Sequence, residues 1–120
     1  MIFAEDRSCT TQFELGQMYR KTEPRSKDFS KAAKWFTYSA EQGYRKAQYK
    51  VGVMYARGLG VKCDYVRAYA WLKIAAAQGS HRAIVYLKKL VGKMRKDQLD
   101  RAHILTRRYY QSYVVPYATS

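Results

Sequence analysis

This chain of 120 residues is poor in the groups from which catalytic and metal sites are built. It has two histidines and nine acidic residues, and neither His81 nor His103 has Cys, His, Asp or Glu neighbours at metal-ligand spacing. So few carboxylates leave little for paired-carboxylate catalysis, and Gly58-Leu59-Gly60 is too short for a phosphate-binding loop. We therefore predict a protein that is not an enzyme and that uses no metal or cofactor.

Long apolar runs are also missing. The sequence has no stretch of about 18 apolar residues, so it predicts no membrane-spanning helix. Its first residues lack the basic region and the long apolar stretch of a secretion signal. This start favours a cytoplasmic protein. The alternative is that Ile2-Phe3-Ala4 is the tail of a removed signal, which would place the protein in the periplasm.

Only two cysteines are present, Cys9 and Cys63, too few for a disulfide framework. The internal repeat described below puts Cys9 before a first helix and Cys63 after one, at opposite ends of the helices. A helix of this length spans about 16 Å, whereas a disulfide needs Cα atoms within about 7 Å. We therefore expect two free thiols, which also fits the cytoplasm.

Acidic residues are outnumbered by 23 lysines and arginines, which gives a net charge of +14. The excess grows along the chain, from +2 in residues 1–40 to +5 in residues 41–80 and +7 in residues 81–120. Such a bias favours an anionic partner, which could be an acidic protein, a nucleic acid or an anionic surface. The alternative is that the charge serves solubility alone.

What the sequence does contain is a segment that occurs twice, 36 residues apart. Leu15-Gly16-x-x-Tyr19 returns as Val51-Gly52-x-x-Tyr55. The positions that also return are Asp28, Ala32, Trp35, Ala40, Gln42 and Gly43, as Asp64, Ala68, Trp71, Ala76, Gln78 and Gly79. A repeat of this length predicts stacked helix pairs, which usually offer a surface to partners rather than a catalytic cleft.

Each copy has the pattern of two helices. In the second copy, apolar residues at helical spacing predict a first helix near residues 47–57 and a second near residues 65–78. Asp64, like Asp28 in the first copy, suits the N-cap of the second helix. The glycines that follow, Gly43 and Gly79, suit a left-handed helix stop.

Gly16 and Gly52 lie inside the first helix of each copy, where glycine costs about 1 kcal/mol relative to alanine. We therefore expect the second helix to approach closely there, through small residues such as Ala68 or Ala76 in the second copy and Ala32 or Ala40 in the first. Trp35 and Trp71 are expected to close each pair by burying a large apolar area.

A third unit begins but is not completed. Ala83 and Leu87 match Ala47 and Val51, whereas Lys88 stands where the glycine would be. Residues 96–112 have the pattern of one amphipathic helix, which we expect to cover the end of the stack. The predicted organisation is a lead segment (1–10), two repeats (11–46 and 47–82), a partial repeat with a capping helix (83–112) and a tail (113–120).

These residues resemble the Sel1-like repeat (SLR) family, a relative of the tetratricopeptide repeat. The resemblance rests on the glycine and tyrosine of the first helix, on Gly58-x-Gly60-Val61, and on Asp64, Ala68, Trp71, Gln78-Gly79 and Ala83. The first copy departs in its inter-helix loop, where Thr22-Glu23-Pro24 replaces the glycines. The resemblance implies an all-α fold, a short right-handed α/α solenoid. It also implies an adaptor role in protein complexes, often in bacterial signalling or envelope assembly.

On the tetratricopeptide-like pattern, partners bind the concave face that the first helices line. The residues placed there are Phe13, Gln17, Arg20, Lys21, Lys46, Tyr49, Val53, Arg57, Arg82, Val85, Lys89 and Lys93. They include ladders with the 36-residue step, such as Lys21, Arg57 and Lys93. An apolar floor flanked by cations would suit an acidic or C-terminal segment of another protein. The residues predicted to shape the repeat itself are Gly16, Tyr19, Asp28, Trp35, Gly43, Gly52, Tyr55, Asp64, Trp71 and Gly79.

Three alternatives stay open. The cations can be solvated groups at helix ends, where they suit the helix dipole. The basic C-terminal third can bind nucleic acid or membrane phosphates instead of a protein. A stack this short can also pair with a second copy, so the chain is a monomer or a weak homo-oligomer. Five tyrosines that the repeat does not explain fit an interface, base stacking or core packing: Tyr44, Tyr109, Tyr110, Tyr113 and Tyr117.

Overall fold

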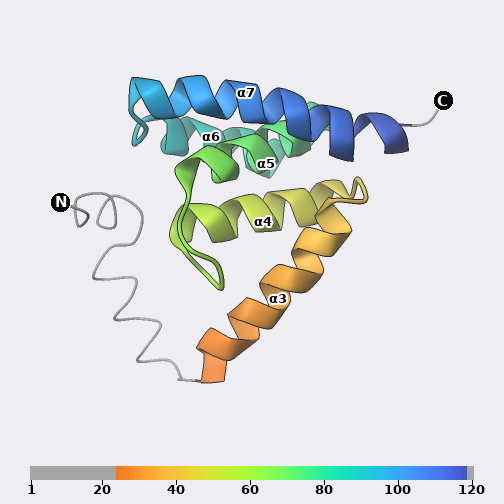
Figure 1. Cartoon of the computed structure of the whole chain (residues 1–120), viewed down its shortest axis with the longest axis vertical. Helices are drawn as coiled ribbons and strands as arrows, with labels where there is room; N and C mark the ends of the chain where they lie inside the picture. The colour runs from red at the N-terminus through yellow and green to blue at the C-terminus, as the bar shows by residue number, and fades with distance from the viewer. Residues whose placement is uncertain (1–23, 119–120) are drawn as a thin grey trace.

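The computed structural model describes residues 24–118, with side chains from residue 29 onward, and these residues contain helices and turns but no strand (Figure 1). The elements in chain order are α3 (Pro24–Ala40), α4 (Arg45–Arg57), α5 (Tyr65–Ala77), α6 (His81–Val91), α7 (Lys96–Tyr113) and the short 3-10 helix η1 (Val115–Tyr117). The predicted all-α fold is confirmed. None of these helices combines the length and the apolar character needed to cross a bilayer.

The helices are packed in the order that a stack of helix pairs requires. α4 and α5 form the second repeat, α5 packs against both α6 and α7, and α3 packs against α4. Figure 1 shows α7 lying along α5, whereas α3 meets α4 at the turn that joins them and then diverges from it. α6 is the first helix of the incomplete third unit, and α7 is the predicted capping helix. Gly16 and Tyr19, on which the sequence predicted the first helix of the first repeat, lie outside the described residues.

The helix ends of the second repeat have the predicted chemistry. Asp64 is the N-cap of α5, and its Oδ1 accepts a hydrogen bond from the Arg67 backbone N–H at 3.1 Å. Gly43 and Gly79 have φ angles of 93° and 100°, which only glycine adopts without strain. Asp28, in contrast, was expected to cap the equivalent helix and does not, because α3 already begins at Pro24 and so contains Asp28.

Gly52 marks the closest approach of α4 and α5. A Cβ atom on Gly52 would lie 2.6 Å from Leu72 Cγ and 3.2 Å from the Leu72 backbone nitrogen. Close approach at this glycine was therefore predicted correctly, but the expected neighbours, Ala68 and Ala76, were wrong. Leu72 lies one helical turn from each of them, so the predicted face of α5 is right and the residue on it is not.

The two tryptophans have different surroundings. Trp71 is 3% exposed, and its ring centroid lies 4.7 Å from that of Tyr109 and 5.2 Å from that of Tyr113, both on α7. Trp35, at the equivalent position of α3, is 72% exposed. The expectation that both rings close their helix pairs is therefore wrong for Trp35. Trp71 is buried because α7 packs on α5, and Trp35 has no comparable contact with the other described residues.

A buried amide joins four helices. Gln48, on α4, is fully buried, and its Nε2 donates to the carbonyl oxygens of Ala40 at 3.1 Å and of Tyr113 at 3.4 Å. Its Oε1 accepts from Gln78 Nε2 at 2.7 Å. These bonds connect the ends of α3, α5 and α7 to α4, and nothing in the apolar pattern had indicated them.

Cys63 corrects the prediction of free thiols, because it is disulfide-bonded. The chain has one other cysteine, Cys9, which lies outside the described residues. The prediction depended on the place that the repeat assigned to Cys9. Because disulfides persist mainly in oxidising compartments, the cysteines no longer support a cytoplasmic location.

The contact at Gly52 predicts a strong effect of added volume. Gly52→Leu would place an isobutyl group where a single Cβ already meets Leu72, so we expect the free energy of unfolding to fall by about 3 kcal/mol. Lys88 occupies the equivalent position of α6 and is exposed, so Lys88→Leu should change it by less than about 0.5 kcal/mol. Urea unfolding followed by circular dichroism measures both values. Equal effects of the two substitutions would contradict the alignment of α4 with α6.

The tyrosines around Trp71 predict a loss of stability at high pH. Burial raises the pKa of Tyr109 to about 12, although the Arg67 guanidinium acts in the opposite direction, and burial also raises the pKa of Tyr113. Since Tyr109 ionises near pH 10 in an unfolded chain, its stabilising contribution is complete below about pH 10 and is lost as the pH rises toward about 12. Melting temperatures across this range should therefore fall less steeply for Tyr109→Phe than for the wild type. Parallel curves would show that Tyr109 ionises equally easily in both states.

Candidate functional site

The predicted partner-binding residues within the described part of the chain lie on α4 and α6. Along α4 they are Lys46, Tyr49, Val53 and Arg57, and along α6 and the turn after it they are Arg82, Val85, Lys89 and Lys93. α4 and α6 contact each other, so the fold brings the two stripes onto neighbouring helices. We call this surface the helix-A face. Phe13, Gln17, Arg20 and Lys21 lie outside the described residues.

The helix-A face has an apolar centre and charged margins. Tyr49 and Val53 are partly buried and pack against the core, and Val85 is partly exposed beside them on α6. The cations predicted on α4 and α6 are all exposed. These exposures are the ones that a binding surface needs, but the binding role of each residue stays a prediction.

Charge is the clearest property of this face. Together α4 and α6 carry seven lysines and arginines and no aspartate or glutamate. Asp64, the next carboxylate in the chain after α4, already lies 3.6 Å from Arg67 Nε. Because opposite charges are missing from both helices, the potential over the face is positive and attracts anionic groups.

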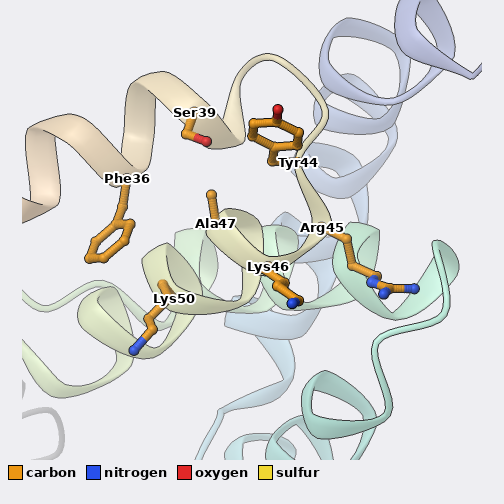
Figure 2. Close-up of a pocket in the computed structure, with 7 residues that line it drawn as sticks. All are labelled: Phe36, Ser39, Tyr44, Arg45, Lys46, Ala47 and Lys50. Atoms are coloured by element: carbon orange, nitrogen blue, oxygen red, sulfur yellow. The ribbon is translucent and has the colours of Figure 1, made fainter.

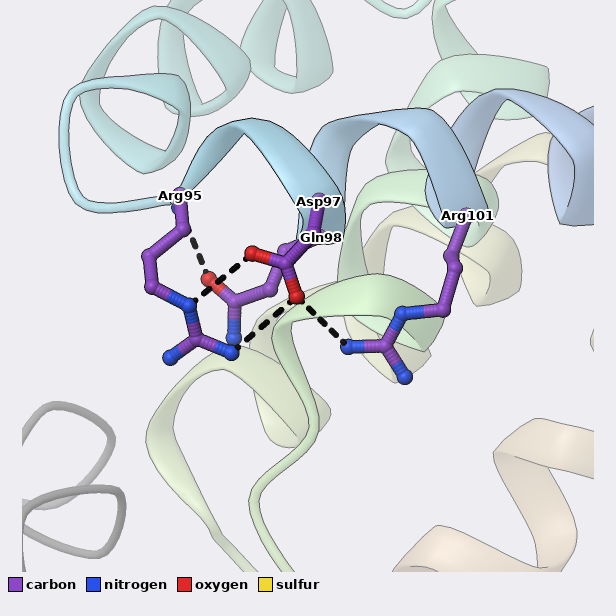
Figure 3. A network of polar contacts seen from close by, with 4 residues as sticks. All are labelled: Arg95, Asp97, Gln98 and Arg101. Carbon is purple, nitrogen blue, oxygen red and sulfur yellow. Dashed lines mark hydrogen bonds and ion pairs between the residues drawn. The ribbon is translucent and has the colours of Figure 1, made fainter.

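The basic C-terminal third is partly neutralised at the start of α7 (Figure 3). Asp97 accepts a hydrogen bond from Arg95 Nε at 3.0 Å, and its other oxygen lies 3.7 Å from Arg101 Nη2. The hydrogen bond from Arg95 is the main reason that the pKa of Asp97 is lowered. Gln98 accepts from the Arg95 backbone N–H at 2.9 Å. Asp97 thus lies in the first turn of α7, where a carboxylate suits the helix dipole.

A hollow that the sequence did not predict lies between α3 and α4 (Figure 2). It is lined by Phe36, Ser39, Tyr44, Arg45, Lys46, Ala47 and Lys50. Lys50 Nζ lies 5.9 Å from the Phe36 ring centroid, close enough for a cation–π contact. Tyr44, whose position the repeat did not explain, was the one indication of this hollow in the sequence. The hollow adjoins the helix-A face through Lys46, the one residue that the two share.

A second surface missed from the sequence is the outer side of α3. Lys31, Lys34, Trp35 and Tyr38 are all exposed there and line a shallow hollow. The sequence placed Trp35 in the core, so its position is a correction. The replacement of Ala70 and Ile74 by Lys34 and Tyr38 in the first copy was a signal that could have found this surface.

The histidines lie apart from these surfaces. His103, on α7, packs edge-to-face on Tyr69 of α5, with ring centroids 5.4 Å apart. His81 is the first residue of α6. Within residues 24–118, no group of three or more His, Cys, Asp or Glu side chains is placed to hold a metal ion.

One solved structure shows the same arrangement of helices. It is the crystal structure of c5321, a protective antigen present in uropathogenic Escherichia coli strains and displaying an SLR fold. The match has a TM-score of 0.71 and 34% sequence identity, and it covers 76% of this chain. It covers 20% of c5321, so the chain spans about one fifth of that protein's length. No curated protein matches the chain.

The family model for the Sel1 repeat matches the chain twice, at residues 11–44 and 45–80. These matches cover more than half of the chain and coincide with the two copies of the internal repeat. Sel1 repeats form a family of scaffolds that is typically not catalytic and that generally mediates protein–protein interactions. This chain belongs to the Sel1 repeat family.

Proposed function

We propose that this protein is a non-catalytic adaptor that binds an acidic or C-terminal segment of another protein on the helix-A face. The observation that carries the proposal is the composition of α4 and α6, which have seven cations and no carboxylate. Tyr49, Val53 and Val85 supply an apolar strip between those cations. A peptide that offers one apolar side chain and neighbouring carboxylates would match both features.

The alternative is binding of nucleic acid or membrane phosphates by the basic C-terminal third. The contacts at the start of α7 weigh against it, because Asp97 pairs with Arg95 and Arg101 in that region. The two functions also differ in their response to salt. Binding to a polyphosphate weakens steeply as salt rises, whereas a protein interface with an apolar centre weakens modestly.

Charge reversal on α6 tests the proposal. The probe is a fluorescent peptide with a free C-terminal carboxylate and with glutamates around a central leucine. Arg82→Glu combined with Lys89→Glu should weaken its binding at least about tenfold, because two cations of the face become anions. Fluorescence anisotropy measures the affinity.

The matched control is Lys62→Glu combined with Lys73→Glu. Lys62 and Lys73 are exposed and lie on neither α4 nor α6, so this variant carries the same change in net charge away from the face. It should bind the peptide as the wild type does. If both variants lose affinity equally, or if a DNA oligonucleotide binds more tightly with a steep salt dependence, the adaptor proposal fails.

A further inference from the structure

The outer side of α3 is the counterpart of a surface that α5 buries. With the 36-residue step, Lys31, Lys34, Trp35 and Tyr38 correspond to Arg67, Ala70, Trp71 and Ile74. On α5, the last three of these are almost completely buried. On α3, all four side chains are exposed, with Trp35 at 72% and Tyr38 at 62%.

The covering of Trp71 shows what kind of group fits this position. Tyr109 and Tyr113 lie one turn apart on α7, and the Tyr113 ring is stacked on Trp71 with an interplanar angle of 14°. A helix with aromatic residues at this spacing therefore covers the tryptophan of the second repeat. The same geometry is open to a helix that approaches Trp35 from outside.

The substitutions within α3 indicate the charge of such a helix. Lys34 replaces Ala70, and a lysine at that position cannot enter a dry contact without an anionic partner. The described side chains of α3 carry two charges, Lys31 and Lys34, and both are positive and lie within one helical turn before Trp35. Trp and Tyr are among the residues that most often dominate binding energy at interfaces, and both rings are exposed here.

A second copy of this chain is a poor occupant. Its α7 carries the tyrosines, but Arg107 and Arg108 precede Tyr109 directly, so they would bring further positive charge to the lysines of α3. Like charges placed together at an interface oppose binding. A helix that packs on the exposed aromatic rings and also pairs with the lysines must carry carboxylates instead.

We propose that Lys31, Lys34, Trp35 and Tyr38 form a second docking surface, which binds an acidic helix of another protein through aromatic residues spaced one turn apart. This surface lies on α3 and is separate from the helix-A face. It binds its partner whether or not the helix-A face binds a peptide. A chain with both surfaces would connect two segments of one partner, or two partners.

The test uses the two indole N–H signals of the folded, ¹⁵N-labelled chain. Trp35→Phe identifies the Trp35 signal and removes only an exposed ring, so this variant should fold. The probe is a helical peptide with two tyrosines one turn apart and flanking glutamates. On addition of this peptide, we expect the Trp35 signal to shift and the Trp71 signal to stay in place.

Charge and aromatic controls make the test specific. Lys31→Glu combined with Lys34→Glu should weaken binding at least about tenfold, and a peptide with lysines in place of the glutamates should not bind. A peptide with alanines in place of the tyrosines should lose its affinity as well. Lys62→Glu combined with Lys73→Glu, with the same net charge, should bind as the wild type does.

Three results would overturn the proposal. The first is an unmoved Trp35 signal at saturating peptide. The second is undiminished binding by the Lys31→Glu, Lys34→Glu variant. The third is a Trp35 signal that shifts with protein concentration alone, which would assign the surface to a second copy. The variant with Arg82→Glu and Lys89→Glu should retain the Trp35 response, so that failure of this surface and failure of the helix-A face can be told apart.

Discussion

The crossing of α4 and α5 at Gly52 is the constraint on which the other contacts depend. With no side chain on Gly52, the two helices meet so closely that Leu72 lies against the α4 backbone. This contact directs Trp71 toward α7 and leaves α4 beside α6. The helix-A face exists because α4 and α6 each turn toward solvent the side that does not pack on α5. A larger residue at this crossing would therefore disturb the core and the surface together.

Features that depend on backbone geometry were predictable from the repeat. Asp64 is an N-cap, Gly79 has the left-handed conformation and Gly52 marks a close contact, because each of these requirements is met by residues within the second repeat. The surroundings of Trp35 were not predictable in this way. Its equivalent Trp71 is buried by α7, a helix that belongs to neither full repeat, so identity of position does not ensure identity of environment. Asp28 shows the same limit, since α3 begins earlier than its counterpart α5.

The candidate surfaces also differ in whether the repeat predicts them. The cations and apolar residues assigned to the helix-A face follow the 36-residue step, because α4 and α6 begin 36 residues apart. The hollow that contains Phe36 and Lys50 depends on the angle at which α3 leaves α4, and no periodicity encodes that angle. For the outer side of α3 the sequence did carry an overlooked indication, the lysine and tyrosine that replace Ala70 and Ile74 in the first copy.

The buried amide of Gln48 has a consequence for how the stack opens. Its carboxamide fastens the C-terminal ends of α3 and α7 to α4, and Gln78 links it to the end of α5. Local unfolding begins where few buried contacts hold the backbone. Among the described helices, we therefore expect the start of α3, which diverges from α4 (Figure 1), to exchange its amide protons with solvent earliest. We expect the helix ends that Gln48 joins to separate last, so that the described helices open from the start of α3 while their ends at Gln48 stay together.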